Sequence, residues 1–221
     1  MTKESMTSIS YEKVKLMVGV PTAGRITVHC ARALLLLMDE LRRNMMYEET
    51  KDQIGLINFK QSSVISGSRE NTAEEALNLN CTHLLFVDDD MQFQPDAVGI
   101  LASRREPIIG VNYRMRYPPA RFTAQSITNE GQAVETTAES TGLEDIDYIG
   151  FGLCLIETRV FRAIPQPWFL PQYLNCKHTT EDLPFFRKAR EYGFRTCVDH
   201  DASKRIGHVG ECVYTWDKNY A

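Results

Sequence analysis

The chain has 221 residues, of which 43% are hydrophobic and 24% charged, a composition typical of a globular protein with one domain. Its 25 basic and 29 acidic residues give a formal net charge of −4, which argues against a general polyanion-binding protein but allows a local basic patch. The apolar run at 33–38 is too short to span a bilayer, and the polar residues 1–10 lack the apolar core of a signal peptide.

The cysteines indicate a reducing environment. All six are widely spaced and form no CxxC pair. A chain of this length does not need a disulfide to stabilise its core, so we expect reduced thiols. Without a membrane segment or a signal peptide, the sequence predicts a cytoplasmic protein. We expect residues 1–221 to form a single domain, with 1–12 as a flexible N-terminal segment.

Hydrophobic periodicity predicts strands and helices that alternate along the chain. Buried strands are expected at 14–20, 55–59, 83–87 and 107–112, and helices at 27–46, 71–78 and 95–101. The polar stretch 117–145 predicts an irregular segment, followed by a strand at 146–157, a loop at 168–178, a helix at 181–192, a short strand at 197–198 and a tail. This order predicts an α/β fold with a Rossmann-like, mostly parallel central sheet flanked by helices.

Three consecutive acids, Asp88, Asp89 and Asp90, follow the strand at 83–87. Ligands of parallel α/β sheets bind at the carboxyl ends of strands, so this is the expected place for a site. By strand alternation Asp88 and Asp90 face one point and Asp89 faces elsewhere, unless a turn begins at the triplet. Two carboxylates there suit a divalent cation, although a solvated acidic turn is the simpler explanation.

The triplet and its neighbours carry a resemblance to a known family. Residues 86–91 resemble the DxD segment of GT-A fold glycosyltransferases, with a family-2-like order of motifs. Four other segments agree in order: Val20-Pro21-Thr22, Ser68-Arg69-Glu70-Asn71, Gly150-Phe151-Gly152, and Thr180-Glu181-Asp182 before an amphipathic helix. A minimal single domain also resembles the compact glycosyltransferases that tailed phages encode. The resemblance implies metal-dependent transfer of a sugar from a nucleotide sugar, by family habit a UDP-sugar, with inversion.

The resemblance also implies roles for individual residues. Asp182 would be the general base, with Glu181 as the alternative, although acids in a first helical turn also complement the helix dipole. Asp88, Asp90 and His208 would hold the cation, and an imidazole ligand favours Mn²⁺ over Mg²⁺. A lone histidine is more often an ordinary surface or core residue. The expected contacts of the nucleotide sugar are Pro21, Thr22, Arg25, Arg69, Asp88 and Asp89.

The acceptor is the least constrained part of the prediction. The resemblance places it at Gly150, Phe151 and Gly152. Residues 112–122 interleave three arginines with three aromatics, which suits phosphates and an unstacked base, so Arg114 and Arg116 are candidate acceptor contacts. Together with the likeness to phage enzymes, this favours a hydroxymethylated pyrimidine in DNA, modified in the bacterial host cytoplasm. A surface-glycan precursor is the main alternative.

Other function classes fit the motifs less well. A nucleotidyltransferase would want a glycine-rich loop after the first strand, where Gly24 stands alone. A non-catalytic binding module would have no use for three clustered carboxylates. A second polar cluster, Asp199-His200-Asp201, is interpreted as a polar turn.

Overall fold

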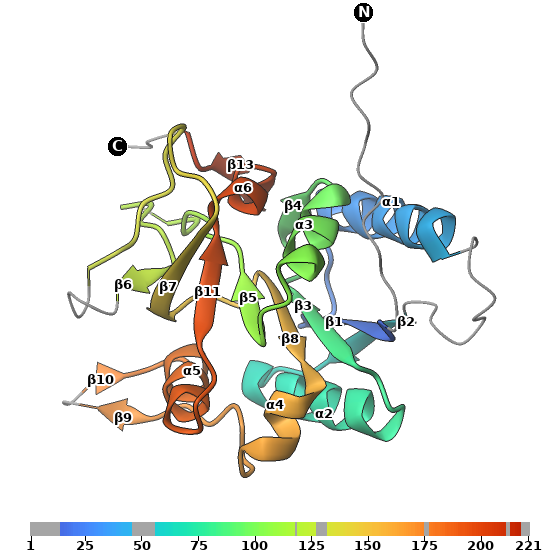
Figure 1. Ribbon diagram of the computed structural model, residues 1–221, viewed down its shortest axis with the longest axis vertical. Helices are drawn as coiled ribbons and strands as arrows, with labels where there is room; N and C mark the ends of the chain where they lie inside the picture. The colour runs from blue at the N-terminus through green and yellow to red at the C-terminus, as the bar shows by residue number, and fades with distance from the viewer. Residues whose placement is uncertain are drawn as a thin grey trace, which may run out of the picture.

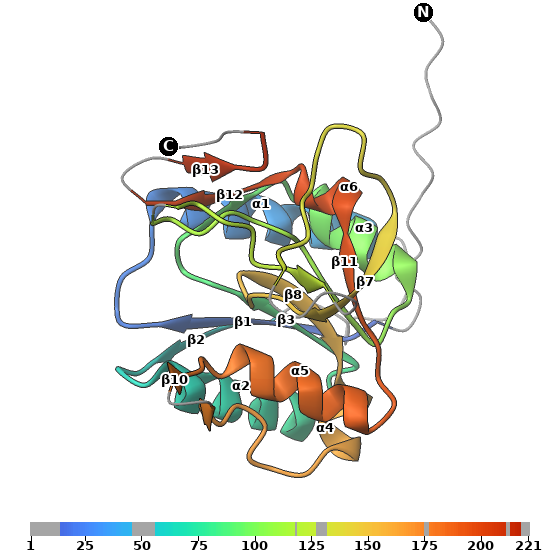
Figure 2. The ribbon, with the colours of Figure 1, turned by 90° about the vertical axis from the view of Figure 1, so that its left-hand side faces the viewer.

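The computed structural model describes residues 14–45, 56–117, 119–126, 132–174, 177–210 and 213–217. The predicted flexible segment 1–12 lies outside these residues. Where the chain is described, a central sheet lies between two layers of helices (Figures 1 and 2). No helix in these ranges is long and apolar enough to cross a membrane.

The central sheet has eight strands in the described part of the chain, in the order β2-β1-β3-β8-β5-β11-β7-β6. Their bounds are β1 Leu16–Thr22, β2 Leu56–Gln61, β3 His83–Val87, β5 Ile108–Gly110, β6 Gln125–Ser126, β7 Leu143–Tyr148, β8 Leu153–Glu157 and β11 Thr196–Asp199. Strand β1 is parallel to β2 and β3, and β5 is parallel to β11, whereas β8 and β7 are antiparallel to their neighbours. Six of these eight strands therefore share one direction, which confirms the predicted α/β fold.

The helices cover both faces of the sheet (Figure 2). On one face lie α1 Val28–Met45, α3 Asp96–Arg104 and α6 His200–Ser203, and on the other α2 Ile65–Asn78, α4 Thr158–Ala163 and α5 Asp182–Glu191. Because side chains alternate along a strand, β3 supplies both cores. Leu85 joins the core under α1, while Phe86 joins the core that contains Phe185 and Phe186 of α5.

A small second sheet lies next to the acidic triplet. It contains β4 Met91–Phe93, β12 Ile206–Val209 and β13 Val213–Thr215, in the order β13-β12-β4. Strand β12 runs antiparallel to β4 and places His208 opposite Met91. His208, which the sequence placed in the C-terminal tail, therefore lies on a strand, and strand pairing fixes its position against the end of the triplet.

Other parts of the chain also differ from the sequence prediction. The predicted strand 146–157 is two strands, β7 and β8, which are separated by a turn at 149–152 and are not neighbours in the sheet. The predicted loop 168–178 contains a short hairpin of β9 Tyr173–Leu174 and β10 Lys177–His178. Helix α4 and strands β4, β6, β12 and β13 were not predicted, because elements this short carry little periodic signal.

Candidate active site

A cavity of about 490 Å³ opens where β1 and β3 end. The donor contacts predicted from the sequence that line it are Pro21, Thr22, Arg69, Asp88 and Asp89. The other predicted site residues that line it are Asp90, Arg116, Glu181, Asp182 and His208. The structure thus brings together residues from both ends of the chain at the carboxyl edge of the sheet, the place where α/β folds bind ligands.

The acidic triplet forms a turn rather than an extension of β3. The strand ends at Val87, and the N–H of Met91 donates to the carbonyl of Asp88 over 3.2 Å. Strand alternation therefore does not apply, and Asp89 lines the cavity together with its two neighbours. The Asp89 carbonyl accepts from the N–H of Thr27 at 2.9 Å, which ties the turn to the segment before α1.

Arg69 joins two of the acids behind the cavity. Its side chain is 5% exposed, and its Nε donates to Glu181 Oε1 at 2.9 Å while Nη2 donates to Asp88 Oδ1 at 3.0 Å. The guanidinium carbon lies 4.8 Å from the ring centre of Phe151. Only Nη1 lacks a hydrogen-bond partner among the described residues. Arg69 is therefore held by carboxylates on two sides, and because its Nη1 is buried it presents no exposed fork to a phosphate.

Asp182 is the first residue of α5 and has a perturbed acidity. Burial raises the pKa of Asp182 to about 8. The positive charge of Arg69 opposes this shift, and the negative charges of Glu181 and Asp88 add to it. Glu181 precedes the helix, and its side chain makes no capping hydrogen bond, so side-chain capping does not explain this acid. A carboxyl group with this pKa can exchange a proton near neutral pH.

Asp90 and His208 contact each other at the cavity. The Nδ1–H of His208 donates to the carbonyl of Arg114 at 3.0 Å, because a carbonyl can only accept. Its Nε2 lies 3.3 Å from Asp90 Oδ2, so a protonated ring donates to the carboxylate, and loss of that proton frees a lone pair on Nε2. Next along the chain, the N–H of Val209 donates to the Asp90 carbonyl at 2.8 Å. Metal-binding histidines are commonly oriented by such a hydrogen bond from the other ring nitrogen.

The charge of Asp90 is set by its neighbours. Burial opposes ionisation, but the hydrogen bond and charge of His208, together with the charge of Arg116, outweigh it and lower the pKa of Asp90. The Nη1 of Arg116 contacts the same carboxylate oxygen that faces His208. Asp88 is not part of this group, because its carboxylate pairs with Arg69. In the described ranges, no group of three or more His, Cys, Asp or Glu side chains is arranged to hold a metal ion.

The glycine turn predicted to bind the acceptor is buried beside the cavity and does not line it. Phe151 is 1% exposed and stacks on Phe186 with ring centres 4.9 Å apart. A Cβ added at Gly150 would lie 2.2 Å from the hydroxyl of Tyr113, and one at Gly152 would lie 2.6 Å from its Cζ. These glycines make room for the Tyr113 ring, and the Gly152 N–H donates to the Tyr113 hydroxyl at 3.1 Å.

Two predicted arginines also lie away from the cavity lining. Arg114 places its guanidinium carbon 4.2 Å from the ring centre of Phe122, and its Nη1 donates to the carbonyl of Ala120 at 3.0 Å. Arg25 is exposed, and its carbonyl accepts from the hydroxyl of Thr22 at 2.9 Å. Arg114 therefore stabilises the segment up to Phe122, and Arg25 closes a local turn with Thr22.

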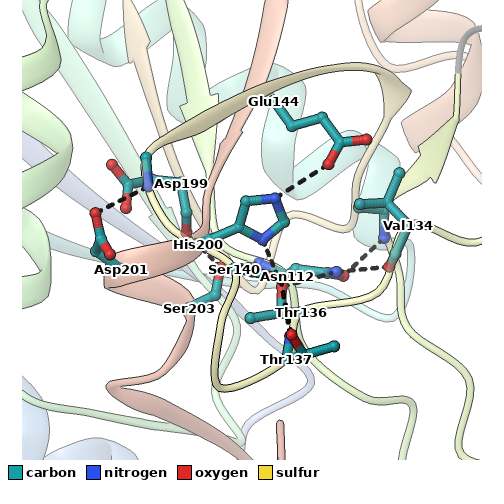
Figure 3. A network of polar contacts seen from close by, with 12 residues as sticks. Asn112, Val134, Thr136, Thr137, Ser140, Glu144, Asp199, His200, Asp201 and Ser203 are labelled. Atoms are coloured by element: carbon teal, nitrogen blue, oxygen red, sulfur yellow. Dashed lines mark hydrogen bonds and ion pairs between the residues drawn. The ribbon is translucent and has the colours of Figure 1, made fainter.

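A buried polar network holds the segment that leads into the site (Figure 3). The N–H of Asn112 donates to Ser203 Oγ at 2.8 Å, and its side chain donates to the carbonyl of Val134 at 2.8 Å and to Thr136 Oγ1 at 3.2 Å. His200 contacts the same Thr136 hydroxyl at 2.9 Å. The network thereby fixes the chain immediately before Tyr113.

The second acidic cluster belongs to this network and is not a turn. Asp199 immediately precedes α6 and accepts from the N–H of Ala202 at 2.8 Å, as a helix-capping aspartate does. The Nε of Arg104 lies 2.7 Å from Asp199, and its Nη2 lies 2.9 Å from Asp201. Both acids thus make structural contacts beside the network (Figure 3), and neither lines the cavity.

The comparisons with known proteins show a fold. No family model matches the chain, and no curated protein matches its sequence. The crystal structure of A197 from STIV superposes with a TM-score of 0.57 at 14% identity, over 94% of this chain and 97% of that one. The inositol-1-phosphate CTP transferase from T. maritima gives a TM-score of 0.45 at 11% identity, over 84% and 85%. The chain thus shares the fold of A197 over nearly its whole length.

Sequence reasoning did not assign some residues that line the cavity. Tyr113 is among them, although it comes three residues after β5 ends, where the carboxyl-edge rule could have found it. Met115, Tyr117 and Thr123 come from the same segment. The pairing of Arg69 with Glu181 had no sequence signal, because it joins residues that are 112 positions apart.

Proposed function

We propose that this chain is a glycosyltransferase with a GT-A-like site, which moves a sugar from a nucleotide sugar to an acceptor hydroxyl with the help of a divalent cation. One observation carries the proposal. The same cavity contains a carboxyl group of raised pKa, Asp182, and a carboxylate–imidazole pair, Asp90 and His208, whose Oδ2 and Nε2 atoms lie 3.3 Å apart. Glycosyl transfer needs both a proton acceptor and charge stabilisation for a leaving diphosphate.

Asp90 and His208 are the proposed protein ligands of the cation. The donor set of one carboxylate and one imidazole fits Mn²⁺ better than Mg²⁺. Two side chains leave most coordination positions to phosphate oxygens and water, as is common for cations that arrive with a nucleotide. The bound cation supplies positive charge that stabilises the diphosphate leaving group.

The proposed nucleoside contacts are Pro21, Thr22 and Asp89, at the end of β1 and beside it. Burial raises the pKa of the Asp89 carboxyl group, and the neighbouring Thr22 opposes this shift. A carboxylate at this position suits the hydroxyls of a ribose. We propose UDP as the nucleotide. Arg69 is proposed to position Asp88 and Glu181, rather than to bind the phosphates with its full fork.

In the proposed reaction Asp182 takes the proton of the acceptor hydroxyl. The acceptor oxygen forms a bond to the anomeric carbon while the bond from that carbon to the diphosphate oxygen breaks. The bonding electrons leave with the nucleoside diphosphate, and a single displacement of this kind inverts the anomeric centre. Glu181 is held by Arg69 and supports the raised pKa of Asp182 through its negative charge.

For the acceptor we propose a hydroxymethylated pyrimidine in DNA, with a surface-glycan precursor as the alternative. Arg116 and Tyr117 both line the cavity, and the side chain of Tyr117 is 66% exposed. An exposed ring beside an arginine can stack on a base that has been flipped out of a duplex. The net charge of −4 does not favour DNA, so the acceptor needs a direct test.

The test uses purified protein, Mn²⁺ and a panel of UDP-sugars, with release of UDP as the measurement. Asp182→Asn should lower transfer by about 10²- to 10⁴-fold and leave Mn²⁺-dependent UDP binding intact. A nucleotidyltransferase would instead release pyrophosphate from a nucleoside triphosphate and a sugar phosphate. Pyrophosphate release without any UDP release would refute the proposal.

The acceptor is tested separately with DNA that contains hydroxymethylcytosine. After incubation with the protein and UDP-sugars, the DNA is digested to nucleosides and analysed by mass spectrometry. A nucleoside heavier by one hexose supports the DNA acceptor. Transfer to a glycan precursor but to no nucleoside removes DNA and leaves the glycosyltransferase proposal standing.

A further inference from the structure

Arg116 contacts the carboxylate oxygen of Asp90 that a bound cation would need. Its Nη1 contacts Asp90 Oδ2, and the same oxygen lies 3.3 Å from the Nε2 of His208. A cation bound between Asp90 and His208 would need the lone pairs of that oxygen and that nitrogen. The guanidinium would then face a divalent cation across one carboxylate oxygen, and like charges at such distances repel strongly.

The backbone around Arg116 is anchored, so a change of partner falls on the side chain. Arg114 and Phe122 form a β-bridge that closes the base of the segment. Within it, the N–H of Met115 donates to the carbonyl of Arg121 at 2.9 Å. The network around Asn112 fixes the chain just before the bridge (Figure 3). The Arg116 side chain itself is 41% exposed, which leaves it room to turn.

Arg69 also lines the cavity, but it cannot exchange a carboxylate for phosphates. Arg69 uses Nε and Nη2 on Glu181 and Asp88, and it is almost fully buried. Arg116 lies at the same cavity with a planar donor fork that fits phosphate oxygens in pairs. A diphosphate in the cavity would therefore be in reach of Arg116 once the arginine leaves Asp90.

We propose that Arg116 neutralises Asp90 when no cation is bound, and exchanges this carboxylate for the phosphates of the nucleotide when a divalent cation binds to Asp90 and His208. The proposal rests on the cation site of the proposed function. It makes Arg116 a positioning residue that couples two ligands. The cation releases the arginine for the phosphates, and the phosphates remove a competitor of the cation, so each ligand raises the affinity for the other.

The exchange predicts that one substitution changes the affinities for Mn²⁺ and for UDP in opposite directions. In Arg116→Ala, Mn²⁺ alone should bind about three- to fivefold more tightly, because an exposed ion pair no longer competes for Asp90. UDP in the presence of Mn²⁺ should bind more weakly than to the wild type. A residue that only supported the fold would weaken both. Arg116→Lys, which keeps the charge, should leave the affinity for Mn²⁺ alone close to that of the wild type.

The measurements are an electron paramagnetic resonance titration of the full chain with Mn²⁺, and calorimetric titration with UDP at saturating Mn²⁺. Arg121→Ala is the matched control, because Arg121 is an exposed arginine of the same segment. Unchanged or weaker Mn²⁺ binding in Arg116→Ala, with Mn²⁺ binding to the wild type, overturns the exchange and leaves the proposed function intact. Mn²⁺ binding to neither protein overturns both.

Discussion

Glu181 accepts a hydrogen bond from Arg69 Nε at 2.9 Å, and both side chains are almost completely buried. The pair joins α5 to α2 across the cavity, because Arg69 belongs to α2 and Glu181 immediately precedes α5. Arg69 also holds Asp88, so one guanidinium fixes acids from two distant parts of the chain. This arrangement gives the first of four predictions.

Glu181→Ala should lower the free energy of unfolding by about 3–5 kcal/mol, because it leaves the buried Arg69 short of a counter-charge. The measurement is urea denaturation followed by circular dichroism. The matched control is Asp39→Ala, which removes an exposed ion pair with Arg43 and should cost less than about 1 kcal/mol. Equal effects of the two substitutions would contradict a buried, charge-dependent role for Glu181.

The protonation of Asp182 should make stability depend on pH. Burial raises the pKa of this group from its ordinary 3.8 to about 8, so between these values the folded state holds a proton that the unfolded state has lost. Its contribution to stability is complete below about pH 4 and is lost as the pH rises to 8, by up to about 1.4 kcal/mol per unit. Unfolding measured between pH 5 and 9 should show this loss in the wild type and not in Asp182→Asn. Parallel curves for the two proteins would argue against the raised pKa.

The two glycines beside Tyr113 should respond differently to the loss of its hydroxyl. A Cβ at Gly150 would meet the hydroxyl first, at 2.2 Å, whereas one at Gly152 would meet ring carbons at 2.6 and 2.7 Å. Each glycine-to-alanine change should cost about 1–3 kcal/mol through overpacking. In a double-mutant cycle, Tyr113→Phe should recover part of the cost of Gly150→Ala but little of that of Gly152→Ala. Equal recovery at both positions would contradict the packing described above.

His208→Ala should weaken Mn²⁺ binding by more than tenfold, because even the outer partners of metal ligands are worth about 10- to 100-fold in affinity. His29→Ala is the control, since His29 is exposed and lies outside the cavity lining. Both variants should unfold at temperatures within a few degrees of the wild type without metal. Isothermal titration with MnCl₂ measures the effect. An unchanged affinity in His208→Ala would remove this residue from the proposed site.

The sequence predicted the centre of the fold better than its edges. Strand β3 has the predicted bounds, because a continuous apolar run that ends at an aspartate is a strong local signal. Alternation failed for Asp89 because the chain turns at the triplet, and such a turn depends on contacts with residues distant in sequence, such as Thr27. The β7–β8 region was predicted as one strand because its apolar pattern continues through the turn.

The candidate site was also predictable only in part. Its acids stand out in the sequence, but the contact of Asp90 with His208 depends on pairing between two short strands, β4 and β12. Neither strand has a periodic pattern long enough to detect, and only the family resemblance pointed to His208. The family resemblance also assigned the glycines at 150 and 152 to the acceptor. Their packing against Tyr113 is visible only in three dimensions.

The backbone hydrogen bond from Val209 to the Asp90 carbonyl has a dynamic consequence. The small sheet of β4, β12 and β13 is separate from the eight-stranded sheet, so it can open locally while the larger sheet stays folded. Each opening would part Asp90 from His208. A ligand that bridges the two side chains must therefore slow the exchange of the Val209 amide hydrogen with solvent, and that single amide becomes a reporter of site occupancy that needs no knowledge of the substrate.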